Sequence, residues 1–353
     1  MLTKPRYSVK DMLMWTRWEI ALFTIIGAVF VLLFKVAGLT FLHVPWTPIA
    51  VIGTAVAFMI GFQNNAAYGR IWEARQIWGG IVNESRSWGM KVKDMVTNEY
   101  AHEQVPEEVL KENVQQLVYR HLAWLTALRY DMRQPKNWET FEQHRTNREW
   151  SEQIHIPEKM SQLEDELFHY LPEEEWHDIM EKSNKPAAIL YAQSAHLRKL
   201  KEKGLIWEFS FLELENLLQQ LFTLQGKSER IKNFPYPRQY ATLSFYFVWM
   251  FLLMLPLGIV PEFDSIGNSL SEKFDWLGTY FDWFAIPFYT AVSWVFHTMQ
   301  RIGTVGENPF EGSANDVPIS TISRAIEIDL RQLIGEPKSS LPKPMPEVYS
   351  VQM

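Results

Sequence analysis

The chain alternates between stretches without charged side chains and segments rich in them. No Asp, Glu, Lys or Arg occurs from Ile20 to Phe34, and after Lys35 none occurs before Arg70. A helix of about 20 apolar residues is long enough to cross a bilayer. The pattern predicts four membrane-spanning helices, at 19–41, 46–63, 239–260 and 282–300. The alternative is a large soluble helical protein with buried central helices, but uncharged stretches this long are rare in soluble chains.

The charges that flank these stretches predict their orientation. Basic residues lie before the first and third stretches and after the second and fourth: Lys4, Arg6, Lys10, Arg17, Arg70, Arg75, Arg230, Lys232, Arg238 and Arg301. The segment between the third and fourth stretches is acidic instead, with one Lys273 among Glu262, Asp264, Glu272, Asp275 and Asp282. Loops on the cytoplasmic side of a membrane carry an excess of Lys and Arg. Both termini and the long middle segment are therefore expected in the cytoplasm.

The middle segment has the character of a soluble helical domain, because its apolar residues recur at helical spacing between charged ones. Near the other end of the chain, 320–334 predicts an amphipathic helix closed by Gly335, followed by an extended proline-rich end. The predicted fold class is an all-α membrane protein, organised in five parts: a cytosolic segment 1–18, membrane helices in 19–63, a cytosolic helical domain 64–238, membrane helices in 239–300 and a cytosolic segment 301–353.

Composition excludes several classes of function. The 353 residues have a net charge of −7 and no Lys/Arg-rich block, which argues against a nucleic-acid partner, and the absence of cysteine excludes disulfides and thiolate metal sites. His169 and His177 stand near glutamates, but such clusters in a charged segment are usually solvated. No residue set suggests an enzyme active site, a cofactor or a metal.

The run "TAVAFMIGFQNNAAYGR", 54–70, carries the main functional hypothesis. Thr54, Phe58 and Phe62 fall on one stripe of a helix because they are four residues apart. In a single helix bundle they would be ordinary packing residues. In several copies around an axis they would form an apolar constriction that can lose its water and close. An uncharged polar exit to cytoplasmic water would then follow, at Gln63, Asn64 and Asn65. Just beyond it, Arg70 and Glu73 are spaced for an ion pair at the membrane surface.

These residues also carry a resemblance to a known family. "GFQNNAAYGRIWEARQIWGGIVNESRS", "NKPAAILYAQSAHLRKL" and "GENPFEGSANDVPIS" are similar to successive landmarks of bacterial members of the bestrophin family, in the same order along nearly the whole chain. The resemblance implies a homopentameric ion channel with four membrane helices per subunit, in a bacterial inner membrane, with the lipid bilayer and monovalent ions as its partners.

The resemblance also implies roles for particular residues. Thr54, Phe58 and Phe62 match the three side chains of the family's pore neck, although a larger aliphatic residue is usual at the position of Thr54. Ile189 matches a second constriction, the cytosolic aperture. Animal members bind calcium with acidic residues after an Asn-Pro-Phe turn. Here that acidic run is degenerate, and no calcium gating is expected at the corresponding positions, Asn308, Ser313 and Asp316.

Ion selectivity stays open at this level. The family label implies a chloride-type channel for small monovalent ions. A cation-selective channel of the same fold is the alternative, because the acidic segment 261–282 would enrich cations at an outer mouth. The helix start at Thr47 and Pro48 would favour anions through its dipole. A secondary transporter is a weaker alternative, since Lys35 is the one fixed charge within the predicted crossings apart from their terminal residues Glu19 and Asp282.

Overall fold

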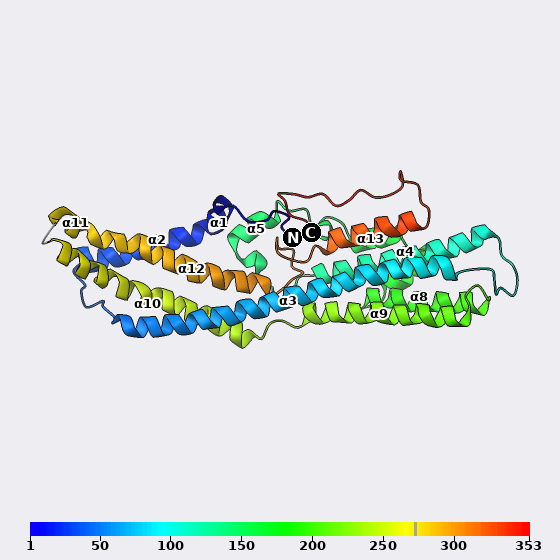
Figure 1. Ribbon diagram of the computed structural model, residues 1–353, viewed down its shortest axis with the longest axis horizontal. Helices are drawn as coiled ribbons and strands as arrows, with labels where there is room; N and C mark the ends of the chain where they lie inside the picture. Colours follow the sequence, from blue (N-terminus) through cyan, green and yellow to red (C-terminus); the bar gives the residue numbers. More distant parts are fainter. Residues whose placement is uncertain (272–273) are drawn as a thin grey trace.

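A computed structural model describes residues 1–271 and 274–353, without the side chain of Leu277, and shows an elongated bundle of helices (Figure 1). Glu272 and Lys273 of the predicted outer segment lie outside the described residues. Within the described ranges the regular elements are helical, and extended backbone pairs at two isolated bridges that both involve Val351. The elements are α1 (Val9–Trp15), α2 (Arg17–Val31), the π-helix η1 (Leu32–Val36), α3 (Trp46–Met95), α4 (Glu107–Arg133), η2 (Phe141–Gln143), α5 (Arg145–Ser151), η3 (Pro157–Lys159), α6 (Leu163–Phe168), α7 (Glu173–Met180), α8 (Lys185–Glu202), α9 (Glu208–Asn233), α10 (Arg238–Ser271), α11 (Asp275–Tyr280), η4 (Phe281–Phe284), α12 (Ala285–Gly306) and α13 (Ile319–Leu333).

Helix α3 runs through both halves of the molecule. Its 50 residues make it about 75 Å long at 1.5 Å per residue. Pro45 is its N-cap and Pro48 lies in its first turn, where backbone N–H groups have no partner within the helix. The helix continues without a break past Gln63, so the predicted boundary between membrane and cytosolic parts falls inside one helix.

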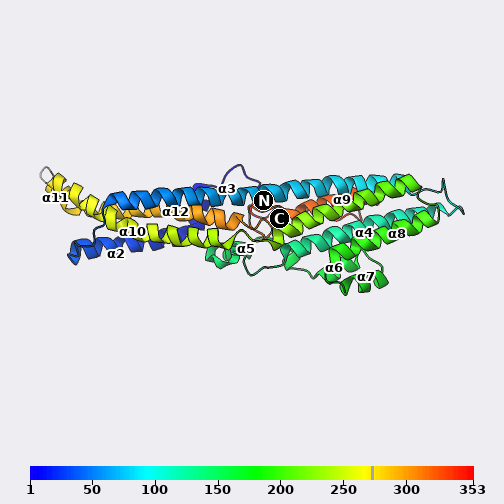
Figure 2. The same ribbon diagram turned by 90° about the horizontal axis from the view of Figure 1, so that it is seen from below.

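Each half has its own hydrophobic core around α3. In one half, α3 packs with α10 and α12, and α12 packs with α2. In the other half, α3 contacts α9 and α13, while α4 packs against α8. Figure 2 shows α6 and α7 on the side of this second half away from α3. The two cores share no buried residue; the first includes Phe23, Ile60 and Tyr289, and the second includes Trp88, Trp124 and Leu221.

Three helical stretches among the described residues are long and apolar enough to cross a membrane: Arg17–Val36, Trp46–Met95 and Glu208–Ser271. They contain the second and third predicted crossings, 46–63 and 239–260, and most of the first, 19–41, which extends beyond Val36. The fourth predicted crossing, 282–300, coincides with η4 and the first part of α12.

Close helix contact in the first half depends on Gly53 of α3. A Cβ atom at this position would lie 2.7 Å from the Phe251 ring of α10, so only glycine allows this approach. Gly61, two turns further along α3, has open space where its Cβ would be. The two glycines therefore lie on different faces of α3. Gly53 faces the neighbouring helix α10, whereas Gly61 faces open space.

The two ends of the chain meet near the middle of the molecule (Figure 1). The backbone N–H of Thr3 donates to Ser350 O at 2.8 Å, and Leu2 pairs with Val351. The predicted amphipathic helix is confirmed as α13, and Gly335 follows it in the left-handed conformation that ends a helix (φ 87°). Residues 336–353, which the structure describes in full, contain no helix, as their proline content predicts.

Candidate functional site

One face of α3 in the first half of the molecule carries an exposed stripe of apolar side chains. The side chains of Phe58 and Phe62 are 66% and 72% exposed, and Thr54 is exposed one turn before Phe58. Large aromatic side chains this exposed at successive turns leave an apolar surface that the chain itself does not cover. The three residues of the predicted neck thus share one face, as their spacing predicts.

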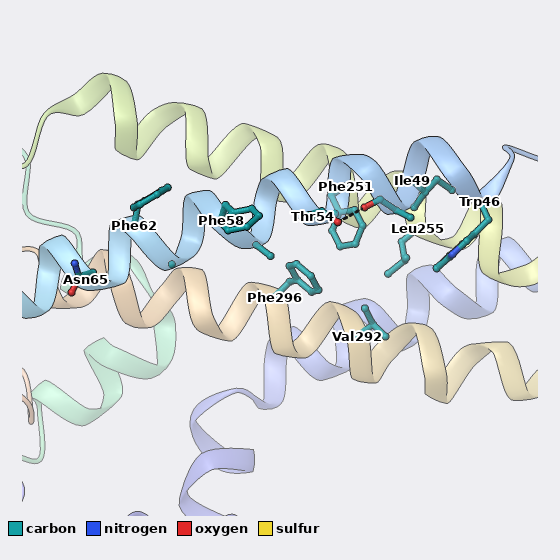
Figure 3. A pocket seen from close by; sticks show the side chains of 14 residues that line it. Trp46, Ile49, Thr54, Phe58, Phe62, Asn65, Phe251, Leu255, Val292 and Phe296 are labelled. Carbon is teal, nitrogen blue, oxygen red and sulfur yellow. Dashed lines mark hydrogen bonds between the residues drawn. The ribbon is translucent and has the colours of Figure 1, made fainter.

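A groove with a volume of about 780 Å³ runs beside this stripe (Figure 3). Small residues of α3 leave room for it, and Phe251 of α10 with Phe296 of α12 forms part of its far wall. The Thr54 hydroxyl donates to Ala50 O at 2.8 Å. Because this hydroxyl is already bonded within its own helix, Thr54 is less polar than a threonine with a free hydroxyl at the same position.

The three amides predicted as a polar exit do not share one environment. Asn65 is exposed and lines the groove, on the same face as Phe58 and Phe62. Gln63 is only 3% exposed and points into the chain's own core. The polar exit predicted from sequence is corrected at Gln63, because consecutive helical residues point about 100° apart. Asn64 packs closely against Gly303 of α12. A Cβ atom added at Gly303 would lie only 2.7 Å from Asn64 Oδ1.

Gln63 instead connects three helices. Its Oε1 accepts a hydrogen bond from Ser244 Oγ of α10 at 2.8 Å, and its Nε2 donates to Glu307 Oε1 after α12 at 2.9 Å. Glu307 is 1% exposed, and burial raises the pKa of its carboxyl above the usual value. The Arg238 guanidinium lies 3.7 Å from the second carboxylate oxygen of Glu307. Gln63, the residue after Phe62, therefore connects α3 to the end of α12 and to the first turns of α10.

Arg70 and Glu73 do not form the predicted ion pair with each other. Arg70 donates to the carbonyl oxygens of Glu307 (2.6 Å), Ile231 (2.8 Å) and Phe234 (3.0 Å). Carbonyls at helix C-termini have no partner within the helix, and a guanidinium with its five donors can satisfy several of them. Glu73 pairs with Arg230 of α9 instead. Arg70 thus joins the ends of α9 and α12 to the middle of α3.

Ile189 does not lie where a cytosolic aperture needs it. Its side chain is fully buried in the core of the second half, on the inner face of α8. The interpretation of Ile189 as an aperture residue is therefore corrected. On this helix the large apolar side chain at the surface is Tyr191, 65% exposed and stacked on Phe222 of α9.

The turn that contains Asn308, Ser313 and Asp316 folds back on itself. Asp316 is buried and accepts hydrogen bonds from the backbone N–H groups of Gly312 (2.8 Å) and Ser313 (3.0 Å) and from the Ser313 hydroxyl. Asn308 Nδ2 donates to Glu311 at 2.7 Å. Arg133 of α4 donates to Phe310 O at 2.9 Å. The polar groups of the turn are thus used in bonds that hold its own shape.

The negative charge of the acidic segment 261–282 is partly neutralised by a lysine of η1. Lys35 Nζ lies 2.6 Å from Asp282, which is buried, and 3.4 Å from Asp264. A count of charges within 261–282 alone therefore overstates the negative potential there. Sequence reasoning missed this pairing because Lys35 is more than 200 residues away from both carboxylates.

The burial of Gln63 could have been found from the sequence. The buried positions of α3 are Ile49, Gly53, Val56, Ile60, Gln63 and Ala67 in this half, each three or four residues after the one before. Gln63 continues this inner stripe, whereas Thr54, Phe58 and Phe62 form a second stripe on another face.

Comparison with known proteins agrees with this architecture. A family model described as bacterial/fungal bestrophin protein matches residues 9–332. A voltage-dependent anion channel-forming protein from Ralstonia nicotianae is 28% identical over 305 residues, which covers 84% of this chain and 82% of the relative. A protein of the same description from Escherichia coli is 25% identical over 307 residues, covering 86% and 82%. A crystal structure of a bacterial bestrophin homologue from Klebsiella pneumoniae shares the fold, with a TM-score of 0.67, 20% identity, and coverage of 91% of this chain and 99% of that one.

The fold and these matches define the class: a helical membrane channel, not an enzyme. The chain belongs to the bacterial and fungal bestrophin family, which confirms the resemblance inferred from its sequence.

Proposed function

We propose that five copies of this chain form a channel for small monovalent ions, with α3 of each copy facing the central axis. Thr54, Phe58 and Phe62 then form three successive rings of a neck, and Asn65 forms the first polar ring below it. The observation that carries this proposal is the stripe of exposed aromatic side chains on the longest helix of the molecule. An apolar ring can lose its water and close the path to ions, which makes it suitable as a gate.

The proposed subunit crosses a bacterial inner membrane four times. Helix α12 is proposed as the fourth crossing, which is supported by its packing among α2, α3 and α10 in the same half. Both termini and the second half of the molecule are assigned to the cytoplasm. This orientation is supported by the basic residues at the junction of the two halves, among them Arg70 and Arg230.

Two features favour anions over cations as the transported ions. The relatives from Ralstonia nicotianae and Escherichia coli are described as voltage-dependent anion channel-forming proteins. Lys35 pairs with two of the outer carboxylates, which reduces the attraction for cations at that mouth. The cation-selective alternative would require acidic side chains at the mouth that are not paired with a basic residue.

Recordings from purified protein in planar bilayers test the proposal. A channel gives unitary current steps, whereas a secondary transporter gives a saturable flux without them. In asymmetric sodium chloride the sign of the reversal potential distinguishes chloride from sodium, and the expected sign is that of chloride. A reversal potential near that of sodium would establish the cation alternative, and the absence of steps would reject a channel of either selectivity.

A further inference from the structure

The first helix of the chain, α1, presents an apolar side outward. Val9 is 77% exposed, and Leu13 and Met14 are exposed on the same side of the helix. The side of α1 that faces the rest of the molecule carries Asp11 and Trp15. Apolar residues of a surface helix in a soluble domain normally face inward. The outward apolar side of α1 therefore indicates a partner or a membrane that covers it.

The charged residues in and around α1 are mostly basic. Residues 1–18 contain one acid, Asp11, and four bases, in a chain whose net charge is −7: Lys4, Arg6, Lys10 and Arg17. Lys10 is exposed beside the apolar residues of α1, whereas Asp11 is used in the capping box with Ser8 that starts the helix. The outward side of α1 is thus apolar and basic, without an acid.

Helix α5 adds basic residues to the corner between α1 and α2. Arg145 Cζ lies 4.4 Å from the centroid of the Trp18 ring, and Trp18 is half-exposed at the start of α2. Arg145 Nε donates to Glu149 at 3.2 Å, but the Arg145 side chain is 68% exposed, so its guanidinium stays accessible. Arg148, three residues further on, is exposed as well. Arg17 pairs with Glu149, which joins this corner to α5.

The exposed apolar side of α1 continues into that of α2. Only Thr16 separates the two helices, and Trp18, Leu22 and Ile25 are exposed on α2. Arg17–Val36 is one of the stretches that are long and apolar enough to cross a membrane. Helix α1 therefore adjoins the end of α2 that the proposed orientation assigns to the cytoplasmic surface. Tryptophan and basic side chains are enriched at that surface of membrane proteins.

We propose that α1 lies in the cytoplasmic surface of the bilayer and, together with Trp18 and Arg145, binds an anionic phospholipid such as phosphatidylglycerol. The inference rests on the proposed function, which makes α2 a membrane crossing. The apolar side chains of α1 contact the acyl chains, as in other amphipathic helices at membrane surfaces. The Arg145 guanidinium donates to the lipid phosphate, and Lys10 adds positive charge. Because phosphatidylcholine has no net charge, the site favours the anionic lipid over it.

Spin labels on single cysteines test where α1 lies, since the chain has no native cysteine. The full chain with Leu13→Cys is labelled in vesicles of equal amounts of phosphatidylcholine and phosphatidylglycerol. Collisions of the label with oxygen, which enters lipid, are compared with collisions with a water-soluble nickel chelate. The label at Leu13 is expected to favour oxygen, as is a label in Ile25→Cys on α2. Met160→Cys, at an exposed position of the second half, should favour nickel.

Two results at Leu13 would overturn the proposal: a preference for nickel, which means water, or shielding from both reagents, which means a second copy of the chain. A preference for nickel at Ile25 would instead reject α2 as a membrane crossing, and the proposed function with it. The two failures are therefore distinguishable.

Arg145→Gln tests the contact with the headgroup. Lipids that the protein retains from nanodiscs of the same composition are counted by native mass spectrometry. Loss of one base near the anionic surface should lower the retained ratio of phosphatidylglycerol to phosphatidylcholine about fivefold. The matched control is Arg198→Gln on α8, because Arg198 is 67% exposed and pairs with Glu202 four residues on, as Arg145 pairs with Glu149. The control should keep the wild-type ratio. The proposal is overturned if Arg145→Gln keeps the wild-type ratio or if Arg198→Gln lowers it equally.

Discussion

Phe62 and Gln63 show how strongly direction on a helix decides the environment of neighbouring residues. Phe62 is 72% exposed, whereas Gln63 is 3% exposed and hydrogen-bonded to two other helices. Gln63 thereby fixes the rotation of α3 about its own axis, and that rotation determines where Phe58 and Phe62 point. The structural role of Gln63 is thus closely connected with the proposed neck.

Replacing Gln63 with methionine should destabilise the fold. The change keeps the length of the side chain but leaves the Ser244 hydroxyl and the Glu307 carboxylate without this partner, at a cost of about 1–3 kcal/mol. Thermal unfolding of the purified protein measures the effect. Gln76→Met, at an exposed position of the same helix, should change stability by no more than about 0.5 kcal/mol. Equal changes in stability at the two positions would show that the hydrogen bonds of Gln63 do not stabilise the fold.

Glu311 should make stability depend on pH. Burial raises the pKa of its carboxyl from 4.5 to about 8. In the unfolded chain this group ionises near its ordinary pKa, so between these values the folded protein holds the extra proton. The stability from this group is therefore complete below about pH 4.5 and is lost as the pH rises to about 8. Asp316, whose pKa burial also raises, acts in the same direction.

Glu311→Gln removes this titration while keeping a similar shape. The thermal midpoint of the variant should fall less than that of wild-type protein between pH 5 and about 8. The control is Glu142→Gln, since the side chain of Glu142 is 58% exposed and lies in the neighbouring segment. If Glu311→Gln follows the wild-type pH profile, the carboxyl of Glu311 is already ionised in the folded protein.

At the scale of elements, the sequence predicts helices well but places the end of α3 poorly. The absence of charge to Arg70 predicts where the membrane environment ends, and it carries no signal about where the helix ends. Helix α3 continues to Met95 because its inner face stays apolar or small after Gln63, with Ala67, Ala74 and Trp78 buried. Hydrophobic periodicity, rather than charge, therefore gives the better estimate of helix length.

The two glycines of α3 allow a test of its packing. Gly53→Ala would place a methyl group 2.7 Å from the Phe251 ring, and overpacking of this kind costs about 1–3 kcal/mol. Gly61→Ala meets open space and should gain up to about 1 kcal/mol from helix propensity. Thermal unfolding should thus show opposite signs for the two variants. A stabilising effect at Gly53 would contradict the close approach of α3 and α10.

At the scale of the whole molecule, the class of protein could be predicted from the sequence, while the contacts between segments far apart in the chain could not. Uncharged stretches and basic flanks depend on local composition, which the sequence displays directly. The pairing of Arg70 with three carbonyl oxygens, of Lys35 with Asp282, and of Ser350 with Thr3 joins residues far apart in the chain. Ile189 is buried for a similar reason, because the packing of α8 on α4 and α9 decides which of its faces is covered.

The account rests on α3 facing a shared water-filled axis, and the lack of native cysteine allows a direct test. Phe62→Cys is recorded in planar bilayers while a charged, water-soluble methanethiosulfonate reagent is added on the cytoplasmic side. Thiols react as thiolates and need contact with water, so a thiol in lipid is protected. Ile25→Cys on α2 is the control, since Ile25 is 61% exposed on another helix of the same half. We expect an irreversible change of current in Phe62→Cys and none in Ile25→Cys; an unmodified current in Phe62→Cys would contradict the proposed neck.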